Sequence, residues 1–137
     1  MKKLFTLLLA TLSIASIYAT EPQTVYCAIS GSHLASHANG YIGQVDIDFG
    51  QGNKSRDYLV DNNGKRLYFE TMISALNHMA KAGWRLEASY TEFNPSLIED
   101  SGLDECIMVM ILSKEITSEE QIIEGIYTKE TYQKNRW

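Results

Sequence analysis

The chain has 137 residues, 45% of them hydrophobic, and a formal net charge of −5 at pH 7. A chain of this length forms one domain. An acidic balance excludes a basic nucleic-acid binder. The longest apolar run, residues 4–17, is shorter than the about 20 residues that a membrane-spanning helix needs, so we expect no membrane span in the mature chain.

Residues 1–19 have the layout of a secretory signal peptide, with two lysines, an apolar run and then small residues. We expect cleavage between Ala19 and Thr20, with cleavage after Ala15 as the weaker alternative. Removing these 19 residues, with Lys2 and Lys3 among them, leaves 118 residues and a formal charge of −7. The sequence therefore predicts a small acidic protein exported to the periplasm or outside the cell.

The first predicted elements are strands. Residues 25–30 form a short β-type run, and residues 41–49 alternate between apolar and polar side chains. In the second run Val45 and Ile47 share one side and Asp46 and Asp48 the other, which is typical of a strand with one face in solvent. Residues 63–64, Asn-Gly, predict a tight turn between the β-type runs 58–60 and 66–69.

Residues 71–82 are the clearest predicted helix, because apolar side chains recur there every three or four positions. Thr71 is the expected N-cap, and Gly83 stands where a left-handed C-terminal cap belongs. Residues 84–90 then alternate, so that Trp84 and Tyr90 would face the same side. We expect a half-buried strand there.

Residues 106–112 are apolar at every position, and a strand of this kind must be covered on both faces. Residues 117–120 fit a capping box that would start a short helix over 118–126, and the chain from Thr128 onward reads as polar and frayed. If the short helix does not cover the second face, a partner or a second copy must do so.

These elements predict an α+β fold: a small antiparallel sheet with one main helix packed on one face, in the order β-β-α-β-β, plus a short C-terminal helix. The expected organisation is a signal peptide over 1–19, a single α+β domain over 20–116, and an acidic short helix with a flexible tail over 117–137. Residues 87–124 hold ten acids and one base. Such a segment serves a cationic partner or is simply a solvated surface.

Five stretches together resemble a group of short exported proteins of unknown function from Gram-negative gut anaerobes. They are VYCAISG (25–31), VDIDFGQG (45–52), NGK (63–65), FETMISALNHMAKAGWRLEASY (69–90) and LSK (112–114). The sequence departs from the group at Arg85, where an acid is usual, and at His78, where an aromatic residue is usual. The resemblance covers roughly residues 25–114. It implies export and a helix–Gly–Trp–strand unit, but no activity and no catalytic residue.

Cys27 and Cys106 are the only cysteines, and both lie in apolar strand-like runs. An oxidising compartment permits a disulfide between them, provided that their strands are adjacent and their side chains share a face. The alternative is two small buried side chains that never meet, since free cysteine is among the most buried residue types.

One weak metal site can be drawn from the sequence. His33 and His37 are four residues apart, and Asp46 and Asp48 lie on the solvent face of the next strand. The simpler interpretation is solvated loop histidines and strand carboxylates, because the glycines and serines around the histidines disfavour a helix. We expect no other cofactor.

The sequence contains no coherent catalytic set, so we expect an exported, non-enzymatic binding or interaction module. Its partner would be a protein or a glycan, with a homodimer as a further alternative and no nucleic acid. The competing hypothesis is a small metal-assisted hydrolase that uses the surface site of His33, His37, Asp46 and Asp48.

Overall fold

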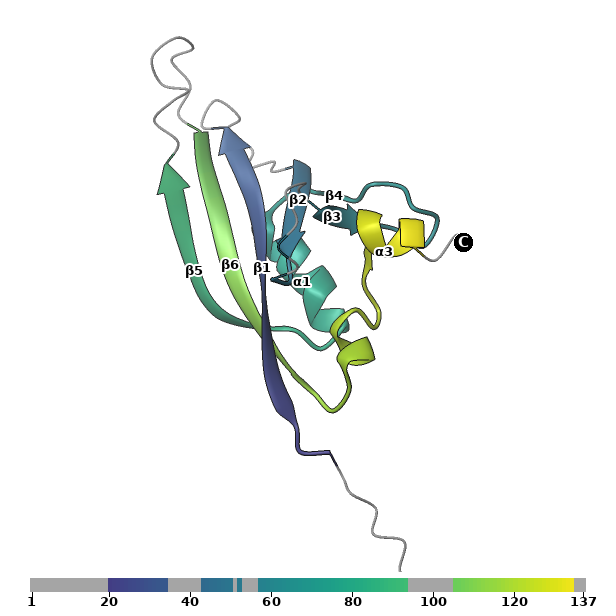
Figure 1. Cartoon of the computed structure of the whole chain (residues 1–137). Coiled ribbons are helices and arrows are strands. Elements are labelled where there is room, and N and C mark those ends of the chain that lie inside the picture. The colour runs from purple at the N-terminus through teal and green to yellow at the C-terminus, as the bar shows by residue number, and fades with distance from the viewer. Residues whose placement is uncertain (1–19, 35–42, 51, 53–56, 94–104, 135–137) are drawn as a thin grey trace, which may run out of the picture.

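A computed structural model of the chain describes residues 20–34, 43–50, 52, 57–93 and 105–134. The predicted signal peptide, residues 1–19, lies outside these ranges. The described part has α+β architecture, with an antiparallel sheet, one main helix and a short C-terminal helix (Figure 1). At this level the predicted fold class is confirmed.

Seven strands form the sheet in the order β5-β6-β1-β2-β3-β7, and β4 pairs with β2 outside this path. The strands are β1 (Gln23–Leu34), β2 (Gly43–Asp48), β3 (Asp57–Val60), β4 (Tyr68–Phe69), β5 (Arg85–Phe93), β6 (Glu105–Ile116) and β7 (Tyr127–Thr128). The helical elements are α1 (Met72–Lys81), the 3-10 helix η2 (Glu119–Ile122) and α3 (Lys129–Lys134). The predicted order counted only four strands and is therefore incomplete. Strands β3 and β4 lie in the β-type runs 58–60 and 66–69, which that order did not count, and β7 was not predicted.

Strands β1 and β6 form the long axis of the sheet. They pair along 12 positions, from Gln23 opposite Ile116 to Leu34 opposite Glu105. Strand β5 pairs with the other side of β6. Figure 1 shows these three strands as a long curved ribbon that extends well past α1.

Helix α1 begins and ends on the signals that the sequence contains. The Thr71 side chain accepts a hydrogen bond from the Ser74 N–H at 3.1 Å, as an N-cap does. At the other end Gly83 has φ +90° and donates to the carbonyl of Ala80, while the Trp84 N–H donates to the carbonyl of Met79 at 3.3 Å. These two bonds form a Schellman motif, which turns the chain from the helix directly into β5.

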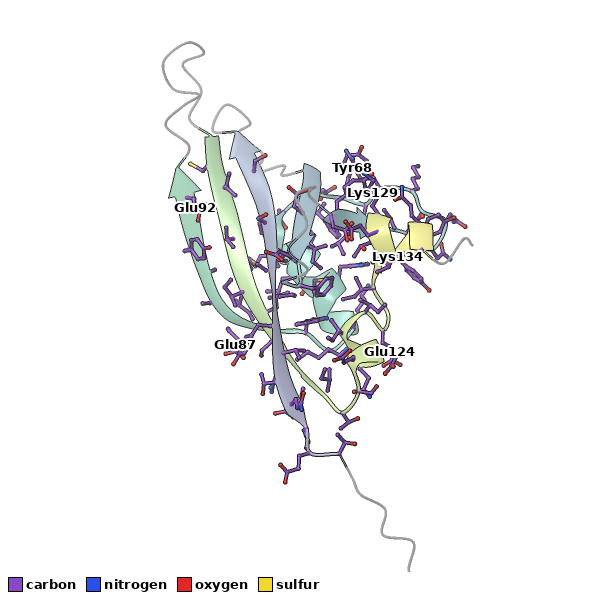
Figure 2. All side chains as sticks on the ribbon, viewed as in Figure 1. Tyr68, Glu87, Glu92, Glu124, Lys129 and Lys134 are labelled. Carbon is purple, nitrogen blue, oxygen red and sulfur yellow. The ribbon has the colours of Figure 1, made fainter. Side chains whose placement is uncertain are left out.

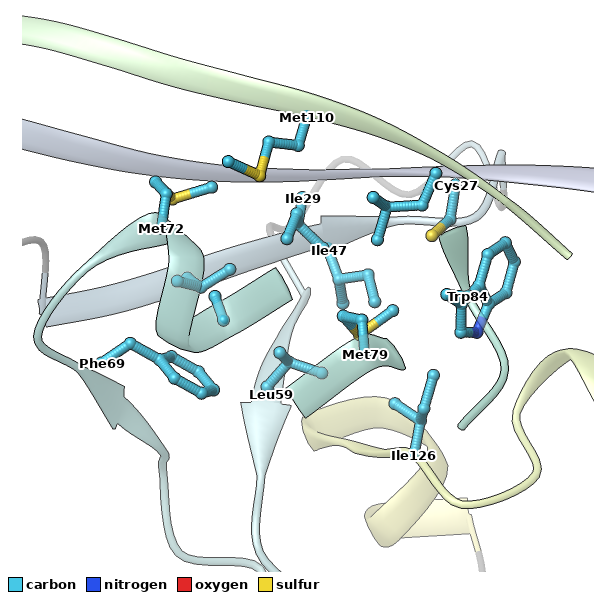
Figure 3. Packing of buried hydrophobic residues seen from close by; sticks show 13 residues of the cluster. Cys27, Ile29, Ile47, Leu59, Phe69, Met72, Met79, Trp84, Met110 and Ile126 are labelled. Carbon is cyan, nitrogen blue, oxygen red and sulfur yellow. The ribbon is translucent and has the colours of Figure 1, made fainter. Parts of the chain in front are cut away.

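The core lies between α1 and the face of the sheet that α1 covers (Figure 3). Helix side chains Met72 and Met79 pack with residues of β1, β2 and β6 in one buried cluster. Trp84 belongs to this cluster and is only 1% exposed, and its ring lies 5.9 Å from the ring of Phe49. Because Trp84 also closes the helix, the same residue joins the helical layer to the sheet.

The segment after β6 packs on the same side as α1. Ile122 and Ile126 pack with the core cluster, and the Lys114 side chain donates to the carbonyl of Gln121 at 2.6 Å. Gly125 lies so close to α1 that an added Cβ would be 3.4 Å from the Cβ of Ala82. The short helix over 118–126 therefore does not cover the second face of β6, and in the structure it is reduced to η2.

Residues after η2 form elements that the sequence did not reveal. The sequence predicts a frayed polar segment from Thr128 onward, whereas the structure places this part of the chain in β7 and α3. Thr128 is fully buried, and the carboxylate of the buried Asp57 accepts the backbone N–H of Glu130 at 3.2 Å. That bond connects residues 73 positions apart, so no local pattern could indicate it.

Strand β5 differs from the predicted half-buried strand. Its register shifts between Leu86, opposite Leu112, and Ala88, opposite Ile111, which marks a β-bulge at Glu87. The extra residue reverses the alternation, so Ala88 and Tyr90 face away from the side that Leu86 faces. Residues 85–92 are all exposed, which makes the half-buried prediction wrong.

The predicted turn at Asn63-Gly64 is confirmed. The Asp61 side chain accepts the backbone N–H groups of Asn63 and Lys65, each at 2.9 Å, and Gly64 has φ +79°. The turn also contacts α3, because an added Cβ at Gly64 would overlap the ring of Tyr132.

We predict that Trp84→Ala destabilises the domain by about 3–5 kcal/mol, because it removes a fully buried ring. Urea unfolding monitored by circular dichroism measures the change. The control is Ile73→Ala, since Ile73 lies on the exposed side of α1 and should change stability by less than about 0.5 kcal/mol. A Trp84→Ala change below about 1 kcal/mol would contradict the packing described here.

A second prediction separates backbone strain from packing at Gly64. Gly50→Ala should lower the free energy of unfolding by about 1–2 kcal/mol, because Gly50 has φ +77°. An added Cβ there meets no atom within 4 Å, so only the backbone strain acts. Gly64→Ala should cost more, because the same strain is joined by overlap with Tyr132. Adding Tyr132→Ala to Gly64→Ala should recover part of the stability that Gly64→Ala loses beyond Gly50→Ala. Thermal unfolding measures this recovery. Equal losses for the two single variants would show that α3 does not pack on this turn.

Candidate binding surface

The four residues of the predicted metal site are not brought together in the described part of the chain. His37 lies outside the described residues, and for His33 only the backbone, in β1, is described. Asp46 is half-buried in β2, and the Asp48 carboxylate accepts the backbone N–H of Gly50 at 2.7 Å. Among the described residues, no group of three or more histidine, cysteine or acidic side chains could hold a metal ion.

The structure separates the two cysteines. Cys27 lies opposite Leu112 and Cys106 lies opposite His33, so the two cysteines are six positions apart along β6. At about 3.4 Å per residue their Cα atoms are roughly 20 Å apart, whereas a disulfide needs less than about 7 Å. Both thiols are free. The disulfide between Cys27 and Cys106 is therefore not formed in this fold, although their strands are adjacent.

Burial makes Cys27 a poor nucleophile. Desolvation, with a smaller contribution from the negative charge of Asp48, raises the pKa of the Cys27 thiol to about 12. The thiol is therefore protonated at neutral pH, and only the thiolate attacks electrophiles or binds metals readily.

The face of β5, β6 and β1 that points away from α1 is the main unpartnered surface of the described structure, and we call it the open face. Leu112 and Met110 point into the core, so the alternate residues of β6 point to the open face. Its members are Tyr26, Ala28 and Ser30 from β1, Ile107, Val109, Ile111 and Ser113 from β6, and Arg85, Ala88, Tyr90 and Glu92 from β5.

The open face has an aliphatic centre and exposed aromatic side chains. Ile107 and Ile111 are half-buried, and Val109, whose direct partner in β5 is Tyr90, is only 7% exposed. Tyr90 is 49% exposed and Tyr26 is 60% exposed. Part of the apolar surface of β6 thus stays exposed, because α1 and η2 cover only the other face.

A hydrogen bond anchors the bulge of β5 at one end of this face. The Ser113 hydroxyl is buried and donates to the carboxylate of Glu87, the bulge residue. Glu87 is thereby drawn onto the open face, while Arg85 lies opposite Ser113 in the same row. No local pattern in the sequence indicates this pair, because a bulge depends on how β5 pairs with β6.

Charges along the open face are mainly negative. Glu92 is in β5, Glu115 in β6 lies opposite Thr24, and Asp48 in β2 lies opposite Ala28. With Glu87 and with Asp46 of β2, which lies opposite Ser30, these make five carboxylates along the face, against the single guanidinium of Arg85. Figure 2 shows Glu87 and Glu92 on the side of the molecule away from Glu124 and Lys134.

Positive charge gathers farther along the sheet, beyond β2. The Arg66 guanidinium lies 4.0 Å from the ring centroid of Tyr58, and the Lys129 amine lies 5.6 Å from the same centroid. Tyr58 is in β3, opposite Asp46. The basic cluster therefore borders the acidic surface on its β2 side, where Tyr58 pairs with Asp46.

One buried polar atom in the described residues has no hydrogen-bond partner, the indole Nε1 of Trp84. An unpaired donor of this kind costs about 1–3 kcal/mol. The burial of the large ring more than offsets that cost.

No known protein family matches the chain, and searches of curated proteins and of solved structures find no match. The resemblance to the exported group therefore stays a prediction. No helix within the described ranges is both long and apolar enough to cross a membrane.

We predict that denatured, unreduced protein has two thiols per chain that react with an alkylating agent, as counted by mass spectrometry. In folded Cys106→Ser protein the remaining thiol, Cys27, should react far more slowly than in the same protein unfolded, because Cys27 is buried. A prereduced sample is the control. Fewer than two reactive thiols without reductant would mean that a disulfide forms and that the register of β1 and β6 is different.

Proposed function

We propose that this protein is an exported, non-enzymatic binding module and that its binding surface is the open face. The observation that supports this most directly is the one-sided cover of β6: α1 and η2 both pack on the other face, and Tyr26 and Tyr90 are left exposed. Exposed aromatic side chains beside a half-buried aliphatic row are a frequent composition of protein-binding surfaces.

Export is proposed from the leader-like composition of residues 1–19 and from the resemblance of residues 25–114 to exported proteins. The free cysteines neither support nor oppose this proposal, because an oxidising compartment permits disulfides without requiring them.

The hydrolase hypothesis is the less favoured one. It needs the Asp48 carboxylate as a metal ligand or base, but that carboxylate already accepts the N–H of Gly50 and thereby holds the end of β2. The open face, by contrast, needs no rearrangement to accept a partner.

The proposal is tested by photo-cross-linking in cells of the producing organism. We would place p-benzoylphenylalanine at Tyr90, on the open face, and, in a matched variant, at Tyr127, which is exposed to a similar extent (46%) but lies in β7. We expect a discrete cross-linked species from position 90 and none from position 127. The mass of the recovered protein should correspond to a chain that begins at Thr20, and the protein should be found outside the cytoplasm.

Three outcomes would contradict the proposal. Cross-links from position 127 alone would place binding elsewhere, and none from either position would remove the binding module. Stoichiometric zinc in the purified protein, lost together with a hydrolytic activity on chelation, would favour the enzyme.

A further inference from the structure

We infer that the open face binds an extended, cationic polypeptide segment in which basic and apolar side chains alternate. This inference rests on the proposed function and names the chemistry of the partner. Two features of the face carry it: its strand-shaped apolar centre and the sign of the charges around that centre.

The apolar centre has the shape of a strand. Ile107, Val109 and Ile111 follow one another at every second residue of β6, so they form a straight row. The neighbouring positions of β1 are small, with Ala28 opposite Ile111 and Ser30 opposite Val109. A partner that lies along this row therefore meets the half-buried Ile107 and Ile111, with the nearly covered Val109 between them and small side chains next to them. An extended segment matches such a row better than a rounded ligand does, because its own side chains repeat with the same period.

The rim of the row determines the charge of the partner. Glu87 and Glu92 lie along the β5 side, Asp46 and Asp48 lie beyond β1 on the β2 side, and Glu115 lies at one end. Arg85 is the one cation within the described part of β5, β6, β1 and β2 that shares this face. The cluster of Arg66 and Lys129 over Tyr58 adjoins only the outer edge of this rim, in β3, where Tyr58 pairs with Asp46. Charge complementarity across an interface therefore calls for a basic partner.

The same charges argue against a second copy of the chain. Two open faces placed against each other would bring ten carboxylates together with only two guanidinium groups. Like charges brought together in this way oppose association.

Glycans are also a weaker match. Exposed tyrosines such as Tyr26 and Tyr90 can stack on sugars, but these two lie on opposite sides of the aliphatic row, in β1 and β5. A sugar over the row itself would lose water from its hydroxyls and gain few hydrogen bonds in return, because the row consists of isoleucine and valine.

The inference is tested with purified protein and defined peptides. The probe is a twelve-residue peptide of alternating lysine and valine, labelled for fluorescence anisotropy, because β6 is 12 residues long. Two peptides of the same length serve as comparisons, one alternating glutamate and valine and one alternating lysine and serine. We expect the lysine–valine peptide to bind about tenfold or more tightly than either comparison, and its affinity to fall with added salt because salt screens exposed charges.

Matched variants then connect binding to the face. The double variant E92Q/E115Q removes two carboxylates from the open face, and E119Q/E124Q removes two from the η2 region, so both change the net charge equally. The first should weaken lysine–valine binding about two- to fivefold per carboxylate at low salt, and the second should change it by less than about twofold. Likewise Tyr90→Ser should weaken binding, whereas Tyr127→Ser should not, although the two rings are similarly exposed.

Several results would overturn the inference. Equal binding of the glutamate–valine peptide, or equal loss in the two double variants, would show that the charge of this face selects nothing. A dimer in sedimentation that Tyr90→Ser abolishes would assign the face to a second copy, and binding to neutral glycans that depends on Tyr90 would assign it to sugars. Cross-linking at position 90 in cells without any peptide preference would leave the proposed binding module standing and remove only the cationic partner.

Discussion

The arrangement of the domain depends on how the chain leaves α1. The Trp84 N–H donates to the carbonyl of Met79, and the Trp84 ring enters the core two residues after the C-cap Ala82. The backbone bond fixes the direction in which β5 starts, and the ring fixes its position against the sheet. Because β5 then pairs with β6, the same junction also determines where the bulge at Glu87 falls.

How much of the sheet is covered follows from the lengths of the elements that meet at that junction. Helix α1 is 10 residues long, or about 15 Å, whereas β1 and β6 have 12 residues and extend about 40 Å. One helix of this length cannot cover such strands, and η2 adds cover only next to the end of α1, where Gly125 meets Ala82. The outer part of β5 and the second face of β6 are therefore not covered by α1 or η2.

Local signals in the sequence were sufficient to predict α1, the turn at Gly64 and the alternation of β2, because each depends on residues close together in the chain. Thr71, Gly83 and the pattern of Val45 and Ile47 act through their own backbone conformation or side-chain period. The extent of the sheet could not be predicted in this way. Strand β7 and helix α3 are held by Asp57 and Thr128, whose partners or burial arise only in the folded chain.

The open face was likewise predictable only where it depends on local sequence. The apolar run over 106–112 predicted cover on both faces of β6, whereas the structure packs α1 and η2 against one face. The excess of acids after residue 86 was visible from composition. Alternation alone, however, placed Trp84 and Tyr90 on one side. The bulge places Tyr90 on the open face instead, since pairing with β6 accommodates an extra residue that a strict period of two does not include.

The composition of the open face also bears on how it would bind. Val109 is buried, Ile107 and Ile111 are only half-exposed, and small or charged side chains surround the row. Such a face is less apolar than the interface of an obligate dimer. On the proposed function, the apolar row would then supply contact area and the carboxylate rim would speed encounter. Affinity would be moderate and binding reversible, as suits a module that meets its partner outside the cytoplasm and releases it again.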